Sequence, residues 1–491
     1  MSKLIRILTL LLALVMTVSA FAACGGNEEE ITTQSSQNEI SETESETEAT
    51  PTNVEQKNYN TEFYLSILDD VNPPKYYWLE ESENDAMSEA VFARQQKVMD
   101  WLGVEIMGVG IGLNHNNYIE PFKTAVKNKD GSVDTLLTHV STGVAGLVAE
   151  AYLRPYDDMP GIALESDYWN IEFMDSLAVN DYHYLGFSDF NILYTNVVAF
   201  NKTMMDQYSD ALEKPLYDVV RDKAWTLDKM IEVVNLVYID TTADGKTPDD
   251  TFGLAGRQWV PWVGFMQACG IKLVEMDETG MYKIAPMNEL NKEKTAALVD
   301  KLSALSASNS AYLDYMTTSV TSVPFTSGRA LLFIEATYSI VSFLDYDVSF
   351  GVLPYPKWDE AQDRHYHLQW GGYLAIPTYL GNEVMVGETL DTLAFYSDDV
   401  KITFYEKMLG KQVADVPDDR AMLDIVWDTV CTDFGQSFSD EAGGILYMLP
   451  QVTYADSGTN LTSYMASKER TGNSNLQKFV KKIEKNNKPR G

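Results

Sequence analysis

The sequence predicts an α/β protein built as two domains or lobes. Strand patterns alternate with helical patterns along the chain, as at 62–68, 85–102 and 103–106. This alternation is typical of βαβ units and a mainly parallel sheet. The chain after Lys57 holds more than 400 residues, which is too long for one small core. With 28 Tyr, 9 Trp and 45% hydrophobic residues, it can fill a large core.

The N-terminus has the pattern of an export signal. Lys3 and Arg6 precede an apolar run that is too short for a comfortable membrane span, so we expect a signal peptide over 1–23. Its end, FAACGG, resembles the lipobox of bacterial lipoproteins, in which cleavage leaves a lipidated cysteine, here Cys24. Phe21 stands where lipoboxes usually carry an aliphatic residue. The alternative is an ordinary cleaved signal with an incidental cysteine.

Residues 24–57 are expected to form the lipidated cysteine and a disordered acidic tether. The segment is rich in Glu, Ser, Thr, Gln and Asn and includes the run SETESETE at 41–48. Such a composition cannot bury enough apolar surface to offset the entropy lost on ordering. We expect a spacer between the lipid and the folded body.

Charge and cysteine content exclude some classes of protein. The formal net charge of −35 argues against nucleic-acid binding, which requires a positive surface, and against broad docking on anionic lipid. After Cys24, only Cys269 and Cys431 remain, so the fold cannot be a disulfide scaffold. The sequence allows a disulfide between these two cysteines, but it favours two separate buried thiols.

Further elements follow the same rhythm. Thr226 is a plausible N-cap for a helix that begins after Trp225. Other helices are expected at 118–129 and 295–305, and other strands at 131–137, 330–334 and 348–353.

Several of these segments match a known family in order. They are 131–158, which ends in LRPYDD; LYTNVVAFNK at 193–202; KAWTLDKM at 223–230; and 325–377, which contains FTSGRA, DVSFGVLPYPK and GYLAIP. The series resembles the bacterial extracellular solute-binding proteins of the maltose-binding-like group (family 1), particularly the sugar-binding lipoproteins of Gram-positive bacteria.

The resemblance implies a periplasmic-binding-protein-like fold of two α/β lobes with a hinge and an interlobe ligand cleft. Lobe 1 would hold 58–190 and about 373–430, and lobe 2 would hold 191–372 and part of the C-terminal segment. The chain would cross between lobes near 187–191 and 371–375, with a third passage later.

The implied function is capture of a carbohydrate by lobe closure and its delivery to the permease subunits of an ABC transporter. The protein would be an extracytoplasmic monomer, held at the cell membrane by its N-terminal lipid only, without a cofactor.

Candidate ligand-binding residues are those that offer aromatic faces or hydrogen bonds at predicted cleft loops. They are Trp78, Glu80, Asp189, Trp259, Glu335, Trp370 and Tyr373. Trp370 and Trp259 are the strongest of these candidates, whereas Trp225 and Trp427 have the pattern of helix-packing residues. Because Tyr and Trp are often largely buried, core packing is the competing interpretation for each aromatic residue.

Two stretches resemble metal-binding motifs but lack a required ligand. The loop from Asp240 begins like a calcium loop, but Thr251 stands where the bidentate Glu is required. His365 and His367 could share one side of a strand, yet no third ligand is near in sequence. We expect that the protein has no metal site and is not an enzyme. The alternative functions are a secreted glycoside hydrolase and a surface polysaccharide-binding lipoprotein without a transport role.

Overall fold

The strands form two main sheets, which confirms the predicted α/β class. The computed structural model of the chain describes residues 49–68, 73–110, 115–139, 143–243, 245–411, 415–454 and 458–486. The predicted signal peptide, Cys24 and most of the predicted tether lie outside these residues. The contacts divide the chain into a short N-terminal unit, 1–50, and a body that begins at Pro51.

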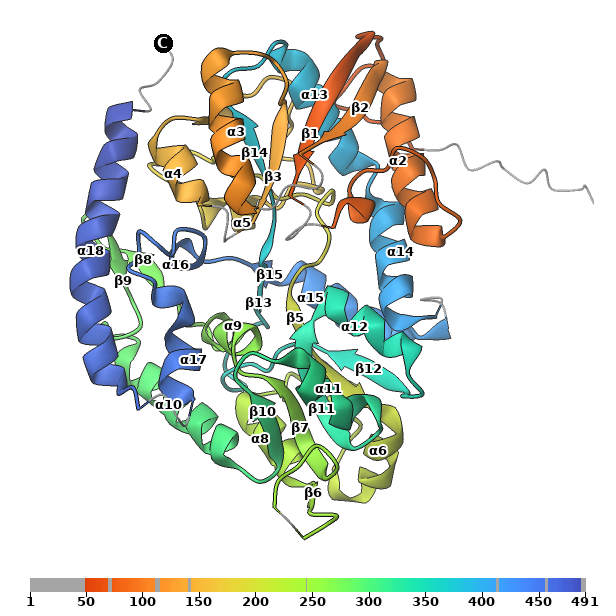
Figure 1. Cartoon of the computed structure of the whole chain (residues 1–491), viewed down its shortest axis with the longest axis vertical. Helices are drawn as coiled ribbons and strands as arrows, with labels where there is room; N and C mark the ends of the chain where they lie inside the picture. Colours follow the sequence, from red (N-terminus) through yellow and green to blue (C-terminus); the bar gives the residue numbers. More distant parts are fainter. Residues whose placement is uncertain are drawn as a thin grey trace, which may run out of the picture. The chain divides into compact units, whose positions relative to one another are not determined.

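The first sheet has five strands in the order β2-β1-β3-β14-β4. Its strands are β1 (Thr61–Ile67), β2 (Val104–Val109), β3 (Thr135–His139), β4 (Leu153–Arg154) and β14 (Gly371–Pro377). Strand β1 pairs in parallel with β2 and β3, whereas β14 enters antiparallel between β3 and β4. Its helices are α2 (Ala86–Leu102), α3 (His115–Asn128), α4 (Val144–Ala149), α13 (Glu383–Phe395) and α14 (Asp398–Leu409) (Figure 1).

The second sheet follows the order β10-β7-β11-β5-β12, with β6 paired to β7. Its strands are β5 (Asn196–Asn201), β6 (Tyr238–Ile239), β7 (Thr251–Arg257), β10 (Ala311–Asp314), β11 (Ala330–Ala336) and β12 (Phe350–Leu353). Strands β10, β7 and β11 are parallel. The helices of this part are α6 (Lys202–Gln207), α7 (Leu216–Arg221), α8 (Leu227–Asn235), α9 (Val260–Ala268), α11 (Thr318–Thr326), α12 (Thr337–Ile340) and α15 (Pro417–Asp428).

The remaining elements join or cover these sheets. The strands and α-helices are β8 (Val274–Met276), β9 (Tyr282–Ile284), β13 (His367–Leu368), β15 (Val430–Cys431), α5 (Ile171–Asp175), α10 (Lys292–Ala307), α16 (Phe434–Ser437), α17 (Met448–Thr453) and α18 (Leu461–Asn486). The 3₁₀ turns are η1 (Pro74–Tyr76), η2 (Tyr156–Asp158), η3 (Ser209–Ala211), η4 (Val341–Asp345) and η6 (Ile445–Tyr447). Helix α18 packs on both β9 and α4.

Local capping explains where the predicted helices begin and end. Asp85 accepts hydrogen bonds from the N–H groups of Met87 and Ser88 at the start of α2. Gly103, at φ 60°, ends that helix in the left-handed conformation that glycine adopts at low cost. Thr226 caps α8 by accepting the Lys229 N–H, which confirms the predicted N-cap.

Three stretches of chain link the two sheets through one side chain, Gln369. Its Oε1 accepts the Tyr194 N–H at 3.0 Å, and its Nε2 donates to the carbonyl oxygens of Ile192 and Gly371. Its own carbonyl oxygen accepts from Gln436 Nε2 at 2.8 Å. Gln369 is fully buried, so these bonds are shielded from water.

The packed body reaches further toward the N-terminus than the tether predicted up to Lys57. Val54 is buried, and its carbonyl oxygen accepts the indole N–H of Trp101 at 2.9 Å. The Lys57 N–H donates to the Trp101 carbonyl oxygen, and Lys57 Nζ pairs with Glu388. The body therefore begins at Pro51, because Val54 packs near the C-terminal end of α2.

Cys269 and Cys431 are free thiols, and burial raises the pKa of each to about 12. Trp225, predicted to pack a helix, is fully buried and donates its indole N–H to the Pro354 carbonyl oxygen. Within the described ranges, no helix is long and apolar enough to cross a membrane.

Candidate functional site

Charged and aromatic side chains gather where the parallel strands of the second sheet end. Strand β7 ends at Arg257, β10 ends at Asp314, and Glu335 is the penultimate residue of β11. Because these strands are parallel neighbours, their carboxyl ends share one edge of the sheet. Loops at such edges commonly hold ligands in α/β proteins.

A buried ion pair forms the floor of this group. Arg257 Nε lies 2.9 Å from Glu335 Oε2, and Arg257 Nη2 lies 2.6 Å from Glu335 Oε1. The Glu335 side chain is fully buried, and Oε1 also accepts the Ala336 N–H. Although burial opposes the charged form, the Glu335 carboxylate raises the pKa of Arg257 above its usual value. The bidentate geometry fixes the guanidinium plane.

Two tyrosines lie beside the ion pair. The rings of Tyr194 and Tyr338 meet edge to face, with centroids 4.7 Å apart and hydroxyl oxygens 3.4 Å apart. Tyr194 also contacts the ring of His139, the last residue of β3, at 5.6 Å. Burial raises the pKa of Tyr194 well above its usual value, so its hydroxyl stays a neutral hydrogen-bonding group. This contact brings the end of β3 to the second sheet.

An aromatic group follows the same edge. Trp259, at the start of α9, stacks on Tyr447 with centroids 4.2 Å apart and planes inclined by 11°. Tyr315 approaches Trp259 edge-on at 5.2 Å, and Tyr454 lies 4.6 Å from Tyr315. Trp259 is only half-buried. Aromatic faces beside neutral hydroxyls and a fixed charge pair suit a ligand with C–H faces and a polar rim.

The two predicted residues at the second crossing are buried. Trp370 is 3% exposed, and its backbone N–H donates to the Tyr194 carbonyl oxygen at 2.8 Å. Its indole Nε1 has no hydrogen-bond partner among the described residues. Tyr373 is fully buried and donates its hydroxyl to the Gln369 carbonyl oxygen at 2.9 Å. The Tyr194 backbone thus joins Trp370 to the ion-pair group.

Trp78 and Glu80 lie against the first sheet instead. The indole N–H of Trp78 donates to the Ile106 carbonyl oxygen at 2.8 Å, and its ring covers Gly108 so closely that a Cβ there would clash. Glu80 is exposed.

Asp189 lines a separate pocket. This pocket has a volume of about 410 Å³ and includes Trp169, Asn170, Trp427 and Asp428, but neither Trp259 nor Glu335. Burial, with the nearby Asp398 and Asp428 carboxylates, raises the pKa of Asp189 to about 6. The predicted site residues are therefore distributed over several places.

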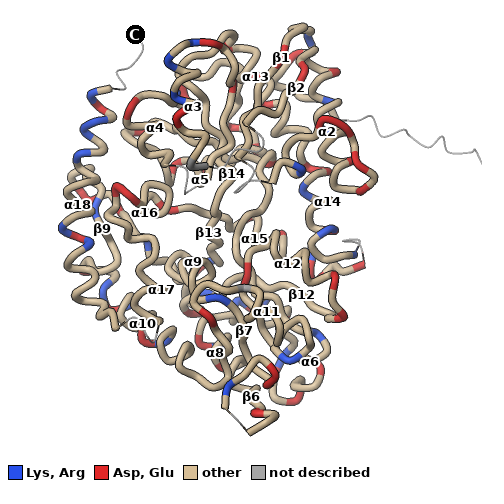
Figure 2. The backbone as a smooth tube through the Cα atoms, viewed as in Figure 1, with Lys and Arg blue, Asp and Glu red and all other residues tan. Residues whose placement is uncertain are grey.

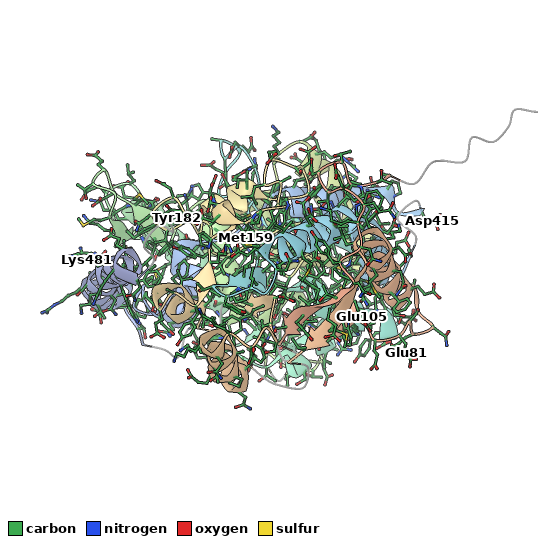
Figure 3. The ribbon with its side chains drawn as sticks, turned by 90° about the horizontal axis from the view of Figure 1, so that it is seen from above. Glu81, Glu105, Met159, Tyr182, Asp415 and Lys481 are labelled. Atoms are coloured by element: carbon green, nitrogen blue, oxygen red, sulfur yellow. The ribbon has the colours of Figure 1, made fainter. Side chains whose placement is uncertain are left out.

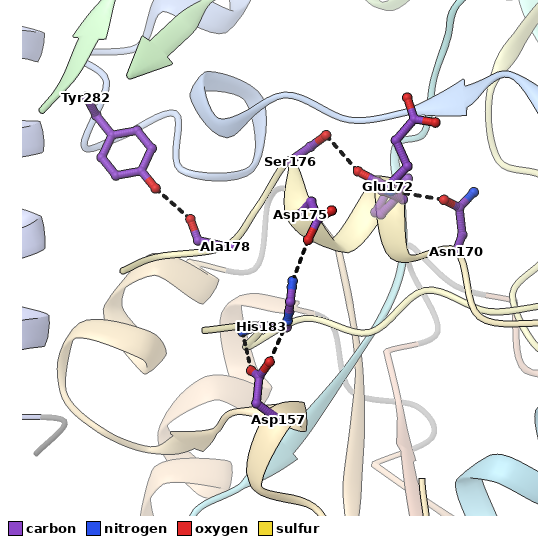
Figure 4. Close-up of polar contacts among 9 residues, drawn as sticks. Asp157, Asn170, Glu172, Asp175, Ser176, Ala178, His183 and Tyr282 are labelled. Carbon is purple, nitrogen blue, oxygen red and sulfur yellow. Dashed lines mark hydrogen bonds and ion pairs between the residues drawn. The ribbon is translucent and has the colours of Figure 1, made fainter. Parts of the chain in front are cut away.

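The chain that leads to the first crossing is held by His183 (Figure 4). Its Nδ1 lies 2.8 Å from Asp157 Oδ1, and its Nε2 lies 2.9 Å from Asp175 Oδ1. The Asp157 carboxylate, with Asp175 in support, holds the pKa of His183 above its usual value. Tyr282 of β9 donates its hydroxyl to the Ala178 carbonyl oxygen in the same region.

His365 and His367 serve the core. His365 Nδ1 lies 2.7 Å from the Tyr355 carbonyl oxygen, and His367 Nε2 accepts the Tyr355 N–H at 2.9 Å. Burial lowers the pKa of His365 to about 4 and that of His367 well below its usual value. Over the described ranges, no three His, Cys, Asp or Glu side chains come together as a metal site.

Replacing His365 with glutamine is expected to flatten the dependence of stability on pH. In the unfolded chain the imidazole binds a proton near 6.5, but in the folded chain only near 4. The unfolded state therefore binds more protons between these values, and stability is lost as the pH falls from about 6.5 to about 4. The substitution should remove roughly 3 kcal/mol of this loss, seen by urea unfolding at several pH values.

The control for that measurement is His183→Gln, because the pKa of His183 is raised instead. Stability from His183 is present at low pH and disappears as the pH rises through its folded pKa. The two variants should change the slope in opposite senses. An unchanged slope for His365→Gln would mean that this imidazole protonates in the fold at its ordinary pKa.

Comparison with known proteins places the fold. No family model and no curated protein sequence matches the chain. Among solved structures, the GacH receptor of Streptomyces glaucescens, solved unliganded and with acarbose, has 14% identity and a TM-score of 0.51 over 86% of this chain and 98% of its own. The chain has the two-lobed fold of the maltose-binding-like solute-binding proteins. The apo form of RafE from Streptococcus pneumoniae agrees, with 13% identity and a TM-score of 0.52 over 85% of this chain and 98% of its own.

Some residues of the group at the carboxyl edge of the second sheet were not predicted from the sequence. Tyr194 and Tyr338 were not among the candidates, although Tyr194 lies inside the segment 193–202 and Tyr338 follows Glu335 by three residues. Gln369 was also missed. Its position directly before Trp370 was the available signal.

Proposed function

We propose that the chain is an extracytoplasmic receptor that captures a carbohydrate, an oligosaccharide, by lobe closure and delivers it to an ABC-type permease. The observation that carries the proposal is the group formed by Arg257, Glu335, Tyr194 and Tyr338 beside the stacked Trp259. It lies at the carboxyl edge of the second sheet, and Tyr194 contacts His139 at the end of β3. The crystal structure of GacH in complex with acarbose supports a sugar-like ligand for a protein with this fold.

The lobes and the anchor belong to the same proposal. The predicted lobe 1, 58–190 and about 373–430, is kept except for α15, which packs on β12 of the second sheet. Lobe 2 comprises 191–372, α15 and part of the C-terminal segment. The signal peptide, 1–23, is removed, and Cys24 carries the lipid that holds the protein at the membrane. The lipobox-like sequence and the acidic spacer support this arrangement.

For the ligand site, we place the sugar rings against Trp259, with Tyr194 and Tyr338 hydroxyls and the Arg257 guanidinium at the polar rim. Trp370 contributes its buried indole N–H, which has no partner within the described part of the chain. The other predicted residues are candidates of lower rank. Tyr373 and Trp78 already donate to backbone carbonyl oxygens. Asp189 lines a separate pocket, and Glu80 is exposed to solvent.

A thermal-shift screen of the chain from Cys24 onward, with Cys24→Ala, against mono- and oligosaccharides tests the proposal. A ligand at a hundred times its dissociation constant stabilises the folded state by about 2.7 kcal/mol, which raises the melting temperature visibly. We expect Trp259→Ala to weaken binding of the same sugar at least about tenfold, as loss of an aromatic contact does.

The matched control is Trp427→Ala, a half-buried tryptophan in the pocket around Asp189. Loss of binding there instead would move the ligand to that pocket. A shift with peptides and none with sugars would keep the fold and reject the ligand class. Shortening of the oligosaccharide, followed by chromatography, would favour the hydrolase.

A further inference from the structure

The C-terminal half of α18 presents a basic face to solvent. The exposed cations of this half are Lys478, Lys481, Lys482 and Lys485. At 100° per residue they fall within a sector of about 100°. The buried residues of this helix, such as Phe479 and Ile483, fall on the opposite side. Figure 3 shows the Lys481 side chain pointing away from the body.

Helix α3 extends this face. Glu150 accepts from Lys482 Nζ of α18 at 3.1 Å and lies 3.5 Å from Lys123 Nζ of α3. Lys127, one turn after Lys123, is exposed. We call the resulting set the lysine surface; it consists of Lys123, Lys127, Lys478, Lys481, Lys482 and Lys485.

Few carboxylates accompany this surface. Glu150 is shared between two of its lysines, and Glu120 pairs with Lys123 at 3.1 Å. Glu484 is the exposed acid of α18 in this half. The surface is therefore locally positive, although the whole chain has 72 acidic and 37 basic residues (Figure 2). Salt screens charges beyond about 8–10 Å, so distant acids do not cancel the attraction of these lysines for a contacting anion.

We propose that the lysine surface docks on anionic phospholipid headgroups and orients the body on the membrane. The occupant follows from charge complementarity and from the chain outside the body. Between Cys24 and Pro51 the spacer spans at most roughly 90 Å when fully extended. A lipid on Cys24 keeps the lysine surface at a high effective concentration near headgroups. This step rests on the proposed lipid anchor, and it concerns one local surface, whereas the net charge of −35 argues against broad docking on anionic lipid.

Vesicle co-sedimentation of the chain from Cys24 onward tests the proposal, with Cys24→Ala so that no acyl chain contributes. The chain should bind vesicles of phosphatidylcholine mixed with phosphatidylglycerol and leave pure phosphatidylcholine vesicles unbound. Raising the salt should release it. The triple variant Lys478→Glu, Lys481→Glu and Lys485→Glu should lower the partition coefficient at least about tenfold, since each lysine near an anionic surface contributes to binding.

The control variant reverses three exposed lysines elsewhere, Lys223→Glu, Lys272→Glu and Lys411→Glu, and so has the same net charge. It should bind like the unmodified chain. Equal loss in both variants, equal binding to neutral vesicles, or binding to inorganic polyphosphate but not to vesicles would overturn the proposal. Both variants should keep the sugar-induced thermal shift, so failure here is distinguishable from failure of the proposed receptor function.

Discussion

Replacing Arg257 with methionine is expected to lower the free energy of unfolding by about 3–5 kcal/mol and to abolish the sugar-induced thermal shift. Glu335 is fully buried, and the substitution removes the guanidinium that holds both of its oxygens. A buried carboxylate without its cation bears the cost of leaving water uncompensated. Urea unfolding of the ligand-free chain measures the first effect, and the sugar screen measures the second.

Two further variants make this result specific. Arg221→Met breaks exposed ion pairs with Asp218 and Asp418, and should cost less than about 1 kcal/mol. The double variant Arg257→Met with Glu335→Leu removes both charges and should recover most of the stability but not the sugar binding. A cost near that of Arg221→Met would show that water reaches Glu335 in solution.

Replacing Gln369 with leucine is expected to cost about 2–4 kcal/mol, because one side chain satisfies three backbone groups in a dry site. The Tyr194 N–H and the carbonyl oxygens of Ile192 and Gly371 all lose their bond to this amide. Since Tyr194 belongs to the ligand group, we also expect about tenfold weaker sugar binding, measured by calorimetry.

Gln95→Leu is the matched control for that substitution. Gln95 is buried on α2 and bonds both the N–H and the carbonyl oxygen of Leu79, far along the chain from the crossings. It should destabilise the fold comparably and leave the sugar affinity unchanged. If both variants weaken binding equally, the effect of Gln369 reflects global stability and not the crossing segments.

The helices could be predicted from sequence because their signals are local. The side chains of Asp85 and Thr226 cap the first turns of their helices, and Gly103 ends α2 in the left-handed backbone conformation. Sheet order could not be predicted in the same way. Strand β14 inserts antiparallel between β3 and β4, and this pairing joins Ala375 to Leu136, which are far apart in the sequence.

The site was predicted in part for the same physical reason. Trp259 and Glu335 were chosen because they follow predicted strands, which is a local criterion. Their partners come from other segments: Tyr447 stacks on Trp259, and Arg257 pairs with Glu335. This criterion failed to separate ligand contacts from packing residues at Trp78. Trp78 also follows a predicted strand, but its indole N–H donates to Ile106 of the neighbouring strand.

Helix α18 has a mechanical consequence for any change between open and closed lobes. Asn473 accepts the Ile284 N–H of β9, and Asn486 donates to the Ala149 carbonyl oxygen at the end of α4. A helix rises about 1.5 Å per residue and resists shortening, so it acts as a strut that holds these two attachments about 20 Å apart. While both hold, the β8–β9 hairpin must travel with α4 and the first sheet. The hairpin, which the proposed boundaries place in lobe 2, would then move with lobe 1.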